Sequence, residues 1–285
     1  MKDTSFSIIS VVYNDISVLQ TIQSALDQDY NNVELIIIDA KSTDGTAKAI
    51  LDFLTQNTKI INTTEQNNEI CIKALANNHG NKTIIFQSRP DSGIYHGMNR
   101  GLKLASSDFC MFINAGDLLF SNTVLSELNI CLDLECDITI CGLMVHYLKQ
   151  DVKVARFPTH DLSRLYRLFA DFGHPNCIFK TKTHKQFLYS KKYALNADYD
   201  LIYKMVQNGV KINFLDRINA IFKTGGASDK KALQSLNEAL QIAFIYNQKL
   251  SMRLKILGFY IFALAKKAIK LIAPKKLFVL LLKFR

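Results

Sequence analysis

The feature that most constrains the fold of this chain is an apolar segment that ends in an acid. Residues 34–46, ELIIIDAKSTDGT, run from apolar side chains into Asp39 and then into a polar turn. An apolar run without alternation predicts a strand that is buried on both faces. An acid at the end of such a strand lies at the carboxyl edge of a sheet, where open α/β folds bind ligands. The alternative is that Asp39 only caps the helix that follows.

Strands and helices alternate along the first half of the chain. We expect strands at residues 6–13, 33–38, 82–87 and 109–113, with helical apolar spacing after each of the first two. Crossover helices of this length join parallel strands, so the pattern predicts the α/β class. Residues 70–76 fit either a short helix or an edge strand.

The pattern changes beyond Asp137. Residues 138–147 and 152–157 are expected as neighbouring antiparallel strands, and residues 177–180, 210–215 and 218–222 as further strands. Helices are expected at residues 162–169, directly after residues 196–198, and along residues 233–244.

Composition limits the class of partner and the compartment. Nine of the 35 Lys and Arg residues lie in residues 251–285, and the first 250 residues carry 26 positive and 25 negative charges. A nearly neutral body argues against nucleic-acid binding. The six cysteines form no CxxC pair, which favours free thiols in a reducing compartment. The N-terminal residues lack a secretory signal pattern, so we expect a cytoplasmic protein.

Residues 251–285 are both apolar and basic, and they contain no Asp or Glu. Their longest uncharged run is ten residues, 256–265, whereas a spanning helix needs about 20. We therefore expect this tail to lie on the inner face of the cytoplasmic membrane, with Lys and Arg on anionic headgroups. The alternative is a core or oligomer helix with a solvated basic face.

Four motifs occur in order at residues 10–14 (SVVYN), 39–46 (DAKSTDGT), 91–101 (DSGIYHGMNRG) and 112–117 (FINAGD). Together they resemble the family 2 glycosyltransferases, which have the GT-A fold. A weaker match at residues 197–201 extends the resemblance to about residue 226. It implies a GT-A domain over residues 1–226, with a nucleotide-sugar-binding half (1–120) and an acceptor half (121–226). C-terminal helices follow at residues 227–285.

The resemblance implies a donor site at the ends of the first strands. Asp39 would accept the imide N–H of a uracil, and Tyr13 would pack on the base. Arg100 would pair with phosphate, although an exposed helix Arg is an equal alternative. The donor-binding residues implied in this way are Val12, Tyr13, Asn14, Asp39, Asp91, Gly93, Asn99, Arg100 and Asn114.

The departing diphosphate is negatively charged, so the chemistry calls for a hard divalent cation, Mn²⁺ or Mg²⁺. By resemblance, Asp117 holds it. The family's metal turn often has two or three acids, whereas this one reads Asn-Ala-Gly-Asp. Diphosphate oxygens and water can complete the coordination. The alternative is a plain turn at residues 114–117.

Displacement at the anomeric carbon also needs a base. Asp198 matches the family's base, and an ordinary Asp with a pKa of about 3.9 is ionised at neutral pH. A base opposite the diphosphate implies inversion of configuration. The alternatives are that Asp198 only caps a helix, or that Asp200 is the base. His174 is either an acceptor or diphosphate contact or a bystander, and residues 225–228 are either a closing loop or a connector.

The resulting hypothesis is an inverting hexosyl- or N-acetylhexosaminyl-transferase. It would move a sugar from a nucleotide-sugar donor, with UDP the expected nucleotide, to a lipid-linked or growing glycan of a surface polysaccharide. The alternative is a non-catalytic, nucleotide-sugar-binding relative that acts as a scaffold, which the single acid of the metal turn supports. A dinucleotide-binding oxidoreductase is set aside because no GxGxxG follows the first strand.

Overall fold

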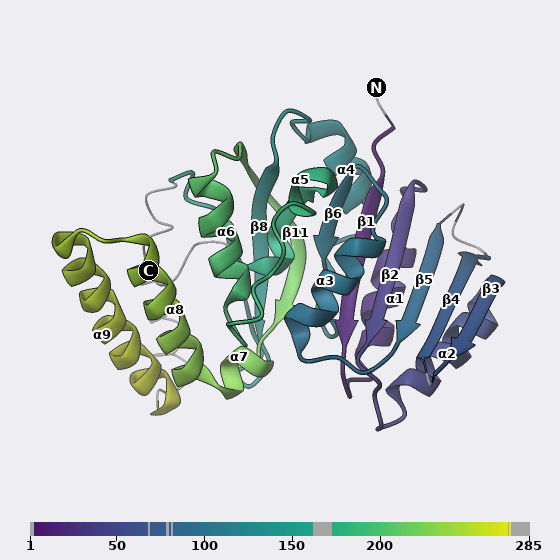
Figure 1. Ribbon diagram of the computed structural model, residues 1–285, viewed down its shortest axis with the longest axis horizontal. Coiled ribbons are helices and arrows are strands. Elements are labelled where there is room, and N and C mark those ends of the chain that lie inside the picture. The colour runs from purple at the N-terminus through teal and green to yellow at the C-terminus, as the bar shows by residue number, and fades with distance from the viewer. Residues whose placement is uncertain are drawn as a thin grey trace.

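The computed structural model describes residues 3–67, 69–77, 80, 82–161, 173–272 and 274. Within these ranges the chain forms an 11-stranded sheet with helices on both faces (Figure 1). The strand order is β3-β4-β5-β2-β1-β6-β10-β8-β11-β7, and β9 pairs with β8. The α/β class predicted from the sequence is confirmed.

Four parallel strands form the middle of the first half of the sheet. They are β1 (Phe6–Val12), β2 (Val33–Asp39), β5 (Thr83–Ser88) and β6 (Phe109–Phe112). Every residue of β1, β2 and β6 is buried, because helices cover both faces of the sheet. The chain enters β1 from the top of Figure 1, so the carboxyl ends of these strands lie at the bottom of that view.

Two helical layers cover the sheet, each with its own apolar core. One layer consists of α1 (Val18–Leu26), α2 (Thr46–Asn57) and α4 (Val124–Cys131). The other consists of α3 (Ile94–Leu104), α5 (Thr181–His184), α6 (Ala197–Gln207) and α8 (Ala232–Tyr246). The helical spacing of apolar residues in the sequence marked the buried face of most of these helices.

Two glycines let α3 lie close to the sheet. A Cβ on Gly97 would lie 2.3 Å from Val11 Cγ1, and a Cβ on Gly101 would lie 2.4 Å from Ile9 Cγ2. The two positions are four residues apart and therefore share one face of the helix. This close approach sets the distance between α3 and the face of the sheet at β1 and β2.

The sheet extends on both sides of the parallel strands. On one side, β3 (Thr58–Gln66) and β4 (Glu69–Ala76) form an antiparallel pair. Residues 70–76 are thus a strand and not a helix, but the edge position expected for them is wrong, because β4 lies between β3 and β5. On the other side, β8 (Ile138–Tyr147) pairs antiparallel with β9 (Val152–Arg156) and with β10 (Cys177–Lys180), as expected for the first pair.

In the second half of the chain, one expected break between strands is absent. The separate strands expected at residues 210–215 and 218–222 form one strand, β11 (Ile212–Lys223), which pairs with β8 and with β7 (Leu118–Leu119). Its register with β8 shifts between Phe214 and Ile218, so a bulge replaces the expected break. The helix expected at residues 162–169 lies outside the described residues.

The chain continues through α7 (Ala227–Lys230) and α8 into α9 (Leu250–Ile272), at the left of Figure 1. One face of α9 packs on α8, where Ile256 and Ala263 are buried. Within the described part of the chain, none of the helices combines the length and apolar character that crossing a bilayer requires.

Candidate active site

The sheet topology brings the four sequence motifs to one edge, because they follow the four neighbouring parallel strands β1, β2, β5 and β6. Val12 pairs with Asp39, and Asp39 pairs with Ser88, at the ends of three neighbouring parallel strands. The turn that contains Asn114 and Asp117 follows β6, which pairs with β1 on its other side. Polar side chains from four strand ends therefore meet at the carboxyl edge, as the sequence predicted.

Asp39 is fully buried at this edge, with 0% of its surface exposed. Its carboxylate accepts hydrogen bonds from Ser42 Oγ (2.5 Å) and Ser88 Oγ (2.6 Å), and from the Ser42 backbone N–H. Ser42 and Ser88 are functional candidates that the sequence did not single out. The position of Ser88 at a strand end is the signal that could have found it. These donors fix the orientation of the carboxylate.

Asn14 joins the first motif to the second. Its backbone N–H donates to Ser42 Oγ (2.8 Å), and its Oδ1 accepts from the Thr43 N–H (2.8 Å). Asn14 adopts φ 51°, a left-handed conformation that Asn tolerates well. Tyr13 is 59% exposed beside it, so its ring is available to a planar ligand.

The third motif is held by an internal ion pair. Asp91 accepts from the Gly93 N–H (3.0 Å) and lies 3.7 Å from Arg100. The exposed alternative for Arg100 is wrong, because Arg100 is 4% exposed and also donates to the Arg89 carbonyl and Gln87 Oε1. The ion pair between Asp91 and Arg100 thus joins the turn after β5 to α3.

Asn99 lies on the buried face of α3. Its side chain donates to the Tyr189 carbonyl and accepts from the Tyr189 N–H, each at 2.9 Å. Both bonds are buried and join α3 to the loop after α5. The structure thus gives Asn99 a bracing contact, whereas the sequence predicted donor binding.

The fourth motif surrounds Asp117. Asn114 Oδ1 accepts from the Val11 N–H (3.3 Å), and the Asn114 carbonyl accepts from the Asp117 N–H (2.9 Å). Asp117 Oδ1 accepts from the Lys223 N–H (3.1 Å). The Asp117 side chain is 6% exposed. Burial raises the pKa of its carboxyl to about 7, and Asp15 adds to this rise.

The surroundings of Asp117 fit a divalent cation that takes most of its ligands from elsewhere. The described residues contain no group of three His, Cys, Asp or Glu side chains that could hold a metal ion. Burial raises the pKa of the Asp117 carboxyl more than the nearby Lys223 charge lowers it, and a bound cation would supply further positive charge. One protein carboxylate with diphosphate and water ligands matches the coordination habits of Mg²⁺.

Asp198 lies in the first turn of α6 and receives a hydrogen bond from α3. Tyr95 donates its hydroxyl to Asp198 Oδ1 at 2.9 Å. Burial raises the pKa of the Asp198 carboxyl above its ordinary value, while the Tyr95 hydroxyl and the Tyr199 backbone N–H oppose that rise. The sequence treated Asp198 as an ordinary carboxyl, whereas its partial burial at the start of α6 raises the pKa.

Tyr95 stacks on Tyr189, which belongs to a cluster of aromatic rings with His174 and His184. His174 Nε2 and His184 Nε2 both contact the Tyr189 hydroxyl, at 2.5 and 3.0 Å. Burial lowers the pKa of His174 to about 3 and that of His184 to about 4. Both imidazoles are therefore neutral near pH 7. His174 lies in the protein interior and packs on Phe112.

The loop expected at residues 225–228 begins with Gly225 at φ 103°. The Gly225 N–H donates to Asp229 Oδ2 (2.6 Å), and the Thr224 N–H donates to the His146 carbonyl (3.0 Å). Residues 227–230 form the short helix α7. The loop is thus tied at both ends by hydrogen bonds.

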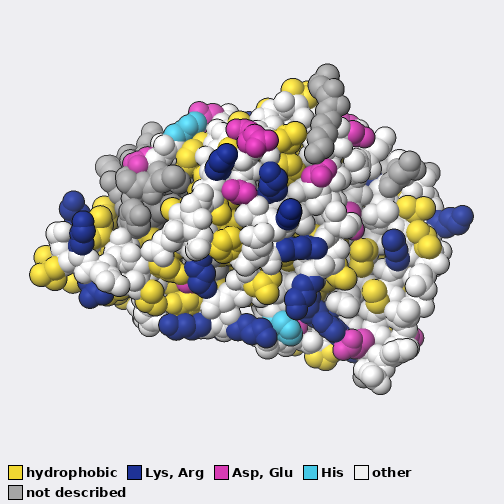
Figure 2. Space-filling model, turned by 45° about the horizontal axis from the view of Figure 1, so that its top comes forward, with side chains coloured by type: hydrophobic (Ala, Val, Ile, Leu, Met, Phe, Trp, Pro, Cys, Tyr) yellow, Lys and Arg dark blue, Asp and Glu magenta, His cyan; other side chains and the backbone are white. Residues whose placement is uncertain are grey.

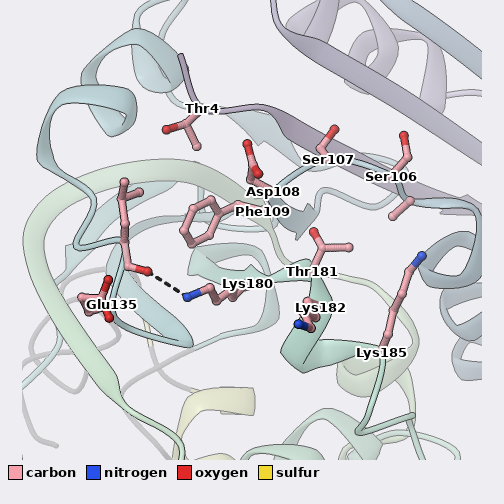
Figure 3. Close-up of a pocket in the computed structure, with 12 residues that line it drawn as sticks. Thr4, Ser106, Ser107, Asp108, Phe109, Glu135, Lys180, Thr181, Lys182 and Lys185 are labelled. Atoms are coloured by element: carbon pink, nitrogen blue, oxygen red, sulfur yellow. Dashed lines mark hydrogen bonds between the residues drawn. The ribbon is translucent and has the colours of Figure 1, made fainter. Parts of the chain in front are cut away.

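A separate cavity lies at the opposite edge of the sheet (Figure 3). It encloses about 590 Å³ beside the start of β6 and of α5. Lys180 lines it and donates to the Leu134 carbonyl. The cavity contains none of the site residues that the sequence predicted. Its lining residues include Ser106, Ser107, Asp108, Glu135, Thr181, Lys182 and Lys185.

Comparison with known sequences gives two matches to glycosyltransferases. The model of glycosyl transferase family 2 matches residues 7–74. An uncharacterized glycosyltransferase of Rickettsia typhi is 24% identical over 230 residues. That alignment covers 73% of this chain and 61% of the relative, so the chain spans under two thirds of its length.

Comparison with solved structures gives the same fold. S. aureus TarS 1–349 in complex with UDP-GlcNAc has a TM-score of 0.60 and 15% identity, over 90% of this chain and 72% of that chain. The mannosyltransferase PcManGT from Pyrobaculum calidifontis, in complex with GDP-Man and Mn²⁺, has a TM-score of 0.58 and 15% identity. That match covers 93% of this chain and 75% of the mannosyltransferase. The fold is thus that of the GT-A glycosyltransferases.

Proposed function

We propose that the chain is a member of the family 2 glycosyltransferases, as the match of that family's model to residues 7–74 supports. We further propose that it transfers a sugar from a UDP-sugar to a glycan or lipid-linked acceptor with inversion of configuration. The observation that carries the proposal is the meeting of Asp39, Asp91 and Asp117 at one sheet edge, beside the exposed ring of Tyr13. The relatives solved with UDP-GlcNAc and with GDP-Man support a nucleotide-sugar donor. The products would be hexosyl or N-acetylhexosaminyl glycans of a surface polysaccharide.

In this proposal the donor lies along the carboxyl edge. The Asp39 carboxylate, which Ser42 and Ser88 orient, accepts the imide N–H of the base. Tyr13 packs on the ring of the base. Val12, Asn14, Gly93 and Asn114 shape the adjoining turns, and the pair of Asp91 and Arg100 holds the third turn in place.

Asp117 would hold Mn²⁺ or Mg²⁺ at the same edge. When bound, the cation supplies positive charge to the departing diphosphate. Asp198 acts as general base and takes the proton of the acceptor hydroxyl as the new glycosidic bond forms. Its raised pKa brings it closer to the range in which a base is most effective near pH 7.

A thermal-shift series with UDP, UDP-GlcNAc, GDP-Man and ATP, each with and without Mn²⁺, tests donor binding. Uridine nucleotides at about a hundredfold excess over Kd should raise Tm by roughly 5 °C when Mn²⁺ is present. ATP is the control for non-specific nucleotide binding. An equal shift with ATP, or no shift with any nucleotide sugar, would contradict the proposal. Tight UDP binding with no release of UDP from any donor would instead favour the scaffold function.

We also propose that α9 attaches the enzyme to the inner face of the cytoplasmic membrane. The helix exposes an apolar stripe opposite the face that packs on α8, formed by Leu250, Leu254, Leu257 and Ile261. These positions follow i, i+4, i+7, i+11 spacing and share one face of the helix. Apolar and basic side chains lie side by side at the left end of Figure 2, where α9 lies. Such a face suits an anionic lipid surface.

Replacing the apolar stripe should release the protein from lipid. Leu254 and Ile261 are 62% and 60% exposed, so the variant Leu254→Glu/Ile261→Glu keeps the packing on α8. We expect wild-type protein to float with vesicles that contain phosphatidylglycerol and the variant to stay in the soluble fraction. Leu233→Glu, at a similarly exposed Leu of α8, is the matched control. Flotation of the double variant at the wild-type level would refute membrane attachment through α9.

A further inference from the structure

The hydroxyl of Tyr95 meets the carboxylate of Asp198 from across the site. Tyr95 lies in the first turn of α3, Asp198 lies in the first turn of α6, and the hydrogen bond between them is 2.9 Å long. We propose that Tyr95 is a positioning residue that orients Asp198 and favours its ionised form during sugar transfer. The inference rests on the proposed function, which assigns Asp198 as the base.

The packing around Tyr95 fixes the direction of its hydroxyl. Tyr95 is buried and stacks on Tyr189, with ring centroids 5.6 Å apart and an angle of 28° between the planes. Asn99 lies one turn further along α3, and its side chain makes two hydrogen bonds to the backbone of Tyr189. The Tyr189 hydroxyl is in turn held by His174 and His184. These contacts hold the Tyr95 ring in the orientation that directs its hydroxyl to Asp198.

The charged group near Asp198 and the Tyr95 hydroxyl have opposite effects on the pKa of Asp198. Glu238 of α8 accepts the N–H groups of Leu195 and Asn196 just before α6 and raises the pKa of Asp198. Among the described residues, Cys177, Tyr189 and Tyr95 also interact with Asp198, and burial raises the pKa of each.

These groups and the two buried histidines are uncharged near pH 7 and supply no positive charge. Against burial and Glu238, the ionised form of Asp198 is favoured by the Tyr95 hydroxyl and by backbone N–H groups. Loss of the hydroxyl should therefore make Asp198 a base that protonates at higher pH.

The substitution Tyr95→Phe removes the hydroxyl and keeps the ring. The measurement is release of UDP from UDP-GlcNAc, or of GDP from GDP-Man, at saturating Mn²⁺ between pH 5 and 9. We expect the acidic limb of the kcat profile to move up by about one pH unit, with an unchanged KM for donor. The rate below the limb should fall about tenfold, and it should approach the wild-type rate at high pH.

Tyr246→Phe, at the end of α8, is the matched control. Tyr246 donates its hydroxyl to Asp200 Oδ1 at 2.9 Å, so this variant removes the same bond two residues further along α6. Its acidic limb should coincide with that of the wild type. A shift for Tyr246→Phe with none for Tyr95→Phe would overturn the inference and make Asp200 the base.

Three other outcomes separate the inference from the proposed function. A fall in rate by one factor at every pH, together with a lower Tm, would show that Tyr95 is only structural and would overturn the positioning role. If wild-type protein hydrolyses neither donor, the proposed function and the inference both fail. Hydrolysis with identical profiles for wild type and Tyr95→Phe would overturn the inference alone.

Discussion

Asp198→Asn should abolish sugar transfer while leaving donor binding intact. Removal of a general base costs about 10² to 10⁴ in rate, so we expect kcat to fall about a thousandfold. Asn has nearly the same shape as Asp, and its amide oxygen can still accept the Tyr95 hydroxyl that now binds Oδ1. The fold of α6 should therefore survive. Calorimetric titration with UDP and Mn²⁺ should give the wild-type Kd.

Asp200→Asn is the control for this prediction. Asp200 is buried two residues away and is held by Lys204 and Tyr246, so its carboxylate already has structural partners. Its substitution should lower Tm through loss of the ion pair but retain most of the activity. The opposite pattern, with activity lost in Asp200→Asn and kept in Asp198→Asn, would move the base to Asp200.

The strand ends could be predicted from the sequence because burial on both faces leaves a continuous apolar run. That run placed Asp39 at the carboxyl edge before any contact was known, and the register with Val12 and Ser88 agrees. The turn at Asn114 and Asp117 was placed by the same reasoning. The local pattern was thus sufficient wherever a side chain's position follows from its own strand.

The partners of these side chains could not be predicted, because they come from distant segments. Arg100 was equally compatible with an exposed helix position until its pairing with Asp91 was known. The bracing of Tyr189 by Asn99 joins residues 90 positions apart. The pKa of Asp198 depends on the packing of α3 and α8 around it. The spacing of residues within α6 does not reveal this packing.

The C-terminal helix has a face for each of the two alternatives that the sequence left open, of which only the packed face is shown by contacts. A basic, apolar segment without acids fits a membrane surface and also fits a packed helix. The structure has α9 buried on one side at Ile256 and Ala263 and exposed on the other at Leu254 and Ile261. Deletion of residues 251–285 would therefore uncover α8 as well as remove the proposed lipid contact. Substitutions on the exposed stripe separate the two effects.

Asp117→Asn should abolish metal-dependent turnover and yet stabilise the metal-free protein at alkaline pH. Loss of the metal-holding carboxylate should lower UDP release from the donor at least about a hundredfold. The matched control is Asp15→Asn, since Asp15 is exposed and acts on Asp117 only through its charge. That control should retain metal-dependent activity. Activity of Asp117→Asn near the wild-type level would refute the metal assignment.

The stability of the metal-free protein tests the same carboxyl independently of activity. Burial raises its pKa in the folded state to about 7, so the folded state holds the proton more tightly than the unfolded state. This contribution to stability is present below about pH 4 and is lost as pH rises through 7. Asn stays neutral, so Asp117→Asn should be more stable than wild type by about 2–4 kcal/mol at pH 8 and equal to it near pH 4.

Mn²⁺ at pH 8 should raise the Tm of the wild type only, because the variant lacks the carboxylate that the cation would neutralise. A lower Tm for the variant at pH 8 without metal would mean that the ionised carboxylate stabilises the fold, through its bond to the Lys223 N–H, and would argue against a site prepared for a cation.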